Sequence, residues 1–132
     1  NEQTEDIDSM PKAIYCQPKA RSGTRAISYR DSLYFFGGYT RKGGTYFNDL
    51  FQYNVVEKQW YELISQSNTQ PRGLITKRKS QIPEARTDHT FVRYKNRFYV
   101  YGGRDEVQIF KDIISIAYFQ ILGRKYKPLQ IE

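Results

Sequence analysis

Residues that commonly carry out chemistry are scarce in this chain of 132 residues. His89 is the single histidine and Cys16 the single cysteine, so neither an internal disulfide nor a cysteine-based zinc site can form. Gly43-Gly44 lacks the Lys-Ser/Thr pair that completes a phosphate-binding loop. The adjacent carboxylates Asp105 and Glu106 are typical of a solvated loop. We therefore expect no catalytic residue, no metal and no cofactor.

Positive charge is the second chemical feature of the chain. Lysines and arginines number 21 against 14 acidic residues, for a formal net charge of +7. Such a surface attracts acidic proteins, nucleic acid or anionic lipid. A basic patch is predicted at Arg72, Lys77, Arg78 and Lys79. Two interpretations stay open: a solvated loop, or phosphate contacts in a nucleic-acid-associated protein. The longest apolar run, 113–122, is shorter than the roughly 20 residues of a membrane span, so no membrane contact is expected.

An internal repeat organises these residues. The segment 18–38 contains a proline, an alanine, an arginine, two tyrosines and a Gly-Gly pair, and 83–103 has the same types in the same order. The offset is constant at 65 residues, since Pro18 corresponds to Pro83 and Gly37 to Gly102. Seven matches without a gap indicate a repeat architecture, in which each unit buries its apolar face against a neighbour.

Short strands are the elements predicted within each unit, because aromatic and β-branched residues alternate with Gly-rich or polar turns. We expect strands at 24–29, 33–36, 50–56, 60–64, 90–94, 97–101 and 113–119. Four antiparallel strands joined by tight turns are typical of one β-propeller blade. The predicted segments are a polar tail at 1–17, a blade at 18–64, a basic connecting loop at 65–82, an incomplete blade at 83–122 and a C-terminal tail at 123–132.

The two units resemble the kelch repeat, with an arginine start, a strand ending in Gly-Gly, an aspartate before the next strand and a tryptophan further on. Residues that match the pattern with structural roles are Gly37, Gly38, Asp49 and Trp60 in the first unit, and Gly102, Gly103 and Asp112 in the second. The chain looks most like the intracellular adaptor type, such as the leucine-zipper-like regulator group. The resemblance implies an all-β fold, a partial propeller of about two blades, and protein binding without catalysis. Trp60 should be largely buried between blades, and the arginine of each unit should bridge to its aspartate.

Protein binding is then expected at the loops that follow each Gly-Gly pair, because binding residues concentrate on loops held by a rigid scaffold. The predicted partner-binding residues are Tyr39, Arg41, Lys42, Tyr46, Arg104 and Asp105. Their charge suits a protein with an acidic surface, in the cytoplasm or the nucleus. Two blades cannot close a ring of about four to eight, so further blades or self-association are expected partners as well.

Overall fold

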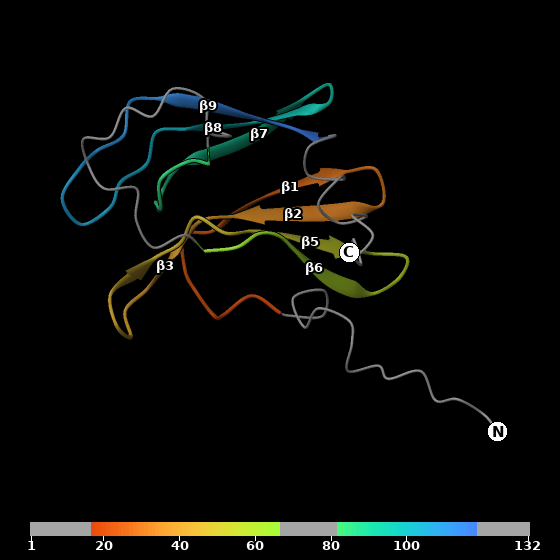
Figure 1. The fold of residues 1–132 in the computed structure, drawn as a ribbon, viewed down its shortest axis with the longest axis horizontal. Helices are drawn as coiled ribbons and strands as arrows, with labels where there is room; N and C mark the ends of the chain where they lie inside the picture. Colours follow the sequence, from red (N-terminus) through yellow and green to blue (C-terminus); the bar gives the residue numbers. More distant parts are fainter. Residues whose placement is uncertain (1–16, 67–81, 119–132) are drawn as a thin grey trace, which may run out of the picture.

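Nine strands in three antiparallel sheets make up the part of the chain that the computed structural model describes, residues 17–66 and 82–118 (Figure 1). The expected all-β fold is confirmed. The first sheet has the order β1-β2-β5-β6, the second sheet β7-β8-β9, and a small hairpin pairs β3 with β4. The strands are β1 Arg25–Tyr29, β2 Ser32–Phe36, β3 Tyr39–Thr40, β4 Thr45–Tyr46, β5 Leu50–Asn54, β6 Gln59–Ile64, β7 Thr90–Tyr94, β8 Arg97–Tyr101 and β9 Ile113–Ala117.

The first sheet is one four-stranded blade, as predicted. Its central strand β2 alternates between buried and partly buried residues, so it has one face toward the core and one that is half-covered. Beyond Gly38 the expected loop contains the β3–β4 hairpin, which leaves the sheet before β5 returns to pair with β2. No helix in the described residues is long and apolar enough to cross a membrane.

The second sheet repeats the first at the predicted offset. An isolated β-bridge joins Ser22 to Tyr39 in the first unit, and the equivalent bridge joins Thr87 to Arg104 in the second. The glycines permit this close approach. A Cβ on Gly38 would lie 2.9 Å from the Ser22 carbonyl oxygen, and one on Gly103 would lie 2.6 Å from that of Thr87. Because real Cβ atoms avoid such distances, glycine is required at both places.

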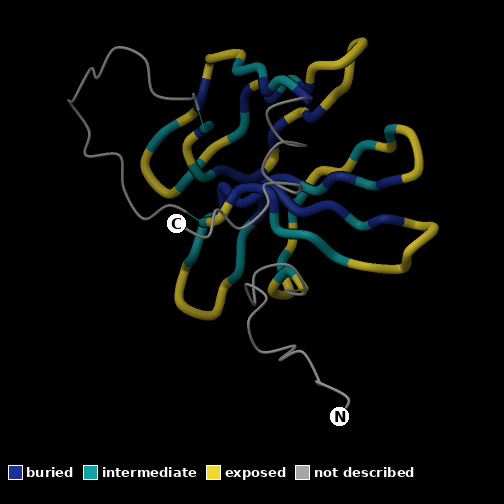
Figure 2. Tube along the Cα trace, turned by 45° about the vertical axis from the view of Figure 1, so that its right-hand side comes forward, coloured by how far each residue is buried: buried dark blue, intermediate teal, exposed yellow. Residues whose placement is uncertain are grey.

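The hydrophobic core lies between the two sheets, which pack face to face. Tyr34 and Phe36 of β2 contact Phe98 and Phe91 of the second sheet, with ring centroids 4.8 and 5.9 Å apart. Figure 2 shows buried segments converging at the centre, with exposed turns around them. A polar bond also crosses between the sheets, since Arg25 Nε donates to the His89 carbonyl oxygen at 2.9 Å. Aromatic packing therefore holds the two units in register.

Trp60 is only partly buried and does not fill the gap between the sheets. Because it lies opposite Tyr53 in the β5–β6 ladder, it faces away from the second sheet. Its ring packs on Phe35 at 5.3 Å and on Tyr53 at 5.0 Å. The predicted aromatic packing is thus present, but on the outer face of the first sheet.

His89 makes the stability of this core depend on pH. Its side chain is 2% exposed, and burial lowers its pKa to about 4 from the ordinary 6.5. The folded chain keeps the ring neutral, whereas the unfolded chain protonates it as the pH falls through 6.5. The resulting stability is complete above that pH and decreases down to about pH 4. We expect the free energy of unfolding to fall by about 2 kcal/mol between pH 7 and pH 5.

His89→Leu is the matched control for this prediction, because the chain has no second histidine. Denaturant unfolding at a series of pH values measures the effect. The variant should show an almost flat free energy of unfolding between pH 7 and pH 5. Equal slopes for the parent chain and the variant would show that His89 is not the group responsible.

Candidate protein-binding surface

The β3–β4 hairpin places two cations in solvent. Arg41 and Lys42 are exposed at its tip, and the tip is closed by a bond from the Gly44 amide to the Arg41 carbonyl oxygen at 3.1 Å. Below them, the rings of Tyr39 and Tyr46 lie 4.6 Å apart and are partly buried. Cross-strand aromatic pairs stabilise a hairpin. This hairpin therefore displays two charges with tyrosine surface beside them.

The loop after Gly103 is built differently, although it starts at the equivalent position. Arg104 is exposed and forms an ion pair with Asp88 at 3.1 Å, which offsets part of its charge. Asp105 turns inward: its carboxylate accepts bonds from the Val107 and Gln108 amides, both at 2.8 Å. Asp105 was predicted to bind a partner, but these bonds give it the role of shaping its own loop.

Backbone hydrogen bonds bring the two loops to one end of the molecule (Figure 1). The Gly38 amide donates to the Arg86 carbonyl oxygen at 2.9 Å, and the Arg86 amide donates to that of Phe47 at 3.2 Å. The next residue, Thr87, exchanges two backbone bonds of 2.9 Å with Arg104. The segment at 86–87 thus bridges the base of the hairpin and the second loop. The turns β1–β2, β5–β6 and β7–β8 lie at the opposite end.

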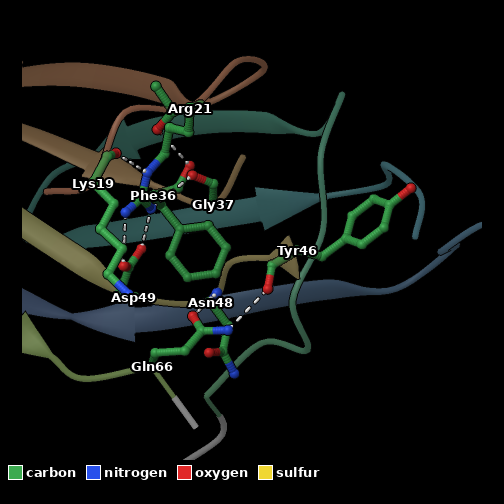
Figure 3. Close-up of polar contacts among 9 residues, drawn as sticks. Lys19, Arg21, Phe36, Gly37, Tyr46, Asn48, Asp49 and Gln66 are labelled. Carbon is green, nitrogen blue, oxygen red and sulfur yellow. Dashed lines mark hydrogen bonds and ion pairs between the residues drawn. The ribbon is translucent and has the colours of Figure 1, made fainter. Parts of the chain in front are cut away.

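A buried arginine clamp lies at the base of the hairpin (Figure 3). Arg21 binds both carboxylate oxygens of Asp49, at 2.5 and 3.0 Å, and also donates to the Gly37 carbonyl oxygen at 3.3 Å. Its guanidinium lies 3.7 Å from the centre of the Phe47 ring. Phe47 is itself buried, 4% exposed, so it packs beneath the hairpin rather than facing solvent. The clamp therefore joins the segment before β1, the end of β2 and the start of β5.

The second unit has the same clamp at the equivalent residues. Arg86 binds the Asp112 carboxylate at 2.8 and 3.3 Å and the Gly102 carbonyl oxygen at 3.0 Å. The Phe110 ring lies 3.9 Å from its guanidinium. The predicted arginine–aspartate bridges are confirmed in both units. The environments differ, because Asp112 is 44% exposed whereas Asp49 is 7% exposed.

A small cavity of about 250 Å³ opens on the outer face of the first sheet. Its lining consists of Phe35, Phe51 and Trp60, together with Thr24 and the segment 18–21. This cavity was not among the features predicted from the sequence. The sequence of β2 could have indicated an apolar outer face, because large apolar residues occupy both faces of that strand.

Other predicted features lie outside the described residues or carry no chemistry. The basic patch at Arg72, Lys77, Arg78 and Lys79 falls outside the described residues, as do both predicted tails apart from Gln17. Within 17–66 and 82–118, no three His, Cys, Asp or Glu side chains gather as metal ligands. Among the described residues, the features that could bind another molecule are thus the loop end and the outer faces of the two sheets. The loop end consists of the β3–β4 hairpin and the loop at 104–108.

One comparison with known protein families agrees with this architecture, and three known proteins are similar to the chain in sequence. The family model for the Kelch motif matches residues 20–63, which is the first unit. A sulfolyase of Thlaspi arvense, N-(sulfonatooxy)prop-2-enimidothioate sulfolyase, is 34% identical over 65% of this chain. Protein tag-53 of Caenorhabditis elegans is 28% identical over 70% of the chain. A probable serine/threonine-protein kinase of Dictyostelium discoideum is 30% identical over 78%. The chain spans 21%, 6% and 6% of these relatives, respectively.

Proposed function

We propose that this chain is a non-catalytic kelch-type module that binds other proteins through its loop end, as the recruiting part of a larger adaptor. The kelch motif at 20–63 supports an interaction repeat. The proposal that the loop end is the binding surface depends on one observation. The 86–87 segment is bonded to both the base of the β3–β4 hairpin and the second loop, so the two lie at the same end. We expect this module to act in the cytoplasm or the nucleus.

The charge of the loop end favours an acidic partner. Arg41 and Lys42 are exposed, and neither forms an ion pair with a described residue. Arg104 adds a third cation, partly offset by Asp88. Exposed charges at the rim of an interface mainly speed association, while packed aromatic residues slow dissociation. Tyr39 and Tyr46 provide that aromatic surface next to the cations.

Reversing the two hairpin charges tests this proposal. An acidic protein that binds the parent chain serves as the partner. At low salt, its association rate with the double variant Arg41→Glu, Lys42→Glu should be roughly tenfold lower than with the parent chain. The difference should shrink as the ionic strength rises, because salt screens exposed charges. Biolayer interferometry over a salt series measures both quantities. An unchanged association rate at low salt would argue against this surface.

The matched control is the double variant Lys58→Glu, Lys95→Glu. Both lysines are exposed residues of turns at the opposite end, and both already have positive φ, 56° and 52°. The control changes the net charge by the same amount without touching the loop end. Its association rate should stay close to that of the parent chain. A similar slowing in both variants would mean that net charge, rather than the loop end, attracts the partner.

A further inference from the structure

The repeat offset identifies which face of the second sheet is the counterpart of the buried face of the first. Ile27, Tyr29, Tyr34 and Phe36 of the first sheet share one face, which packs against the second sheet. The residues 65 positions later are Val92, Tyr94, Tyr99 and Tyr101. By the β7–β8 register they also share one face, but it points away from the first sheet. The second sheet thus repeats an interface-forming face and turns it outward.

The outward face consists largely of apolar and aromatic residues that are nevertheless exposed to solvent. Val92 is 47% exposed, Tyr94 65%, Tyr101 52% and Ile113 68%. Ile113 belongs to the same face because it pairs with Tyr101 across β8 and β9. Contiguous apolar surface of this kind on a sheet marks a contact site or a liability for aggregation.

The first sheet carries the complementary surface on its own outer face. Phe91, Phe98 and Val100 are among the residues with which the second sheet packs on the first. Their equivalents 65 positions earlier are Ala26, Leu33 and Phe35, which lie on the outer face. Tyr53 and Trp60 extend this face with aromatic surface. The outward face of the second sheet and the outer face of the first sheet therefore each provide one half of the contact that is already present between the two sheets.

We propose that a second copy of this chain docks on the outward face of the second sheet with the outer face of its first sheet. The arrangement is head to tail, with the second copy placed as the second sheet is placed on the first. The central contact of Phe36 with Phe91, at 5.9 Å, would then recur between Tyr101 and Ala26 of the second copy. This self-association uses the outer sheet faces and does not require the exposed cations Arg41 and Lys42 of the hairpin.

Backbone groups support the same geometry. At the centre, the Gly38 amide donates to the Arg86 carbonyl oxygen and the Arg86 amide to that of Phe47. The equivalent bonds would join the Gly103 amide to the Arg21 carbonyl oxygen of the second copy, and the Arg21 amide of that copy to the Phe110 carbonyl oxygen. The Arg25 bond to the His89 carbonyl oxygen has no equivalent, because Thr90 stands in the place of Arg25. The new contact therefore depends mainly on apolar burial.

Two single variants separate the two faces. Tyr101→Glu places a carboxylate at the centre of the outward face, and Ala26→Glu places one at its predicted contact. Both positions are exposed in the single chain, so folding should survive. Val92→Glu, on the same face as Tyr101, is a second and independent test. Val56→Glu is the control, since Val56 is 76% exposed in the β5–β6 turn and lies on neither face.

Light scattering coupled to gel filtration measures the masses over a concentration series. The parent chain and Val56→Glu should rise above the monomer mass of 15.7 kDa as concentration rises. Tyr101→Glu, Val92→Glu and Ala26→Glu should each stay monomeric. Because each variant keeps one working face, a mixture of Tyr101→Glu with Ala26→Glu should form a dimer of twice that mass, and no larger species.

Three results would overturn the proposal. One is a parent chain that stays monomeric at every concentration, which would leave the faces to a different occupant. Another is continued assembly of Tyr101→Glu and Val92→Glu. The third is a mixture of the two complementary variants that remains monomeric, since head-to-tail docking requires that they pair. Loss of acidic-partner binding in the hairpin variant with assembly intact would leave this inference standing.

Discussion

Arg21→Ala is expected to lower the free energy of unfolding by about 3 to 5 kcal/mol. The side chains of Arg21 and Asp49 are 6% and 7% exposed, so the variant leaves a buried carboxylate without its partner. The bond to the Gly37 carbonyl oxygen and the contact with the Phe47 ring are lost as well. Because the clamp joins three segments of the first unit, the cost should appear in the global unfolding transition. Urea denaturation followed by tryptophan fluorescence measures it.

Arg104→Ala is the matched control for this prediction. Its ion pair with Asp88 has a similar distance, 3.1 Å, but both side chains are more than half exposed. Solvent-exposed pairs of this kind contribute about 0 to 1 kcal/mol. A loss of stability in Arg104→Ala as large as that in Arg21→Ala would show that burial does not set the strength of the clamp.

Phe98→Ala should have an effect of similar size, about 3 to 5 kcal/mol, through a different mechanism. Phe98 is fully buried, and its ring contacts Tyr29, Tyr34, Phe91 and Tyr118 at 6.0, 4.8, 5.8 and 6.1 Å. Removing the ring opens a cavity between the two sheets, so both the core of the second sheet and its attachment to the first are weakened.

Val92→Ala in the neighbouring strand is the control for the core substitution. Val92 lies on the outward face of the same sheet and is 47% exposed, so its truncation in the single chain should cost under about 1 kcal/mol. Both variants are compared by thermal unfolding at low protein concentration, where self-association does not contribute. Equal shifts of the melting temperature would contradict the assignment of Phe98 to the interface between the sheets.

The repeat allowed much of this fold to be predicted from sequence. The Gly-Gly pairs, the strand before each pair and the arginine–aspartate bridges all recur at nearly the same offset. A recurring set of residues indicates that the same local geometry is built twice. The structure contains both copies, with Arg21 on Asp49 and Arg86 on Asp112. Strand ends were less accurate, since β5 ends at Asn54 and β9 at Ala117 rather than two residues later.

Side-chain direction was harder to predict than strand position. A strand with large residues on both faces, such as β2, does not reveal which face meets the neighbouring sheet. Trp60 was therefore placed between the sheets, although the β5–β6 register turns it outward. Asp105 was predicted to bind a partner because it lies in the loop that follows Gly103. Its bonds to the Val107 and Gln108 amides depend on the loop backbone, which composition does not specify.

Hydrogen exchange of the parent chain, alone and in complex with a captured acidic protein, tests most directly whether the loop end is the binding surface. The proposed function predicts that amide exchange slows in 39–46 and 104–108 on binding. The turns at 55–58 and 94–97, at the opposite end, should be unchanged. Slower exchange confined to those turns, with unchanged exchange in the β3–β4 hairpin, would contradict the proposal that the loop end recruits the partner.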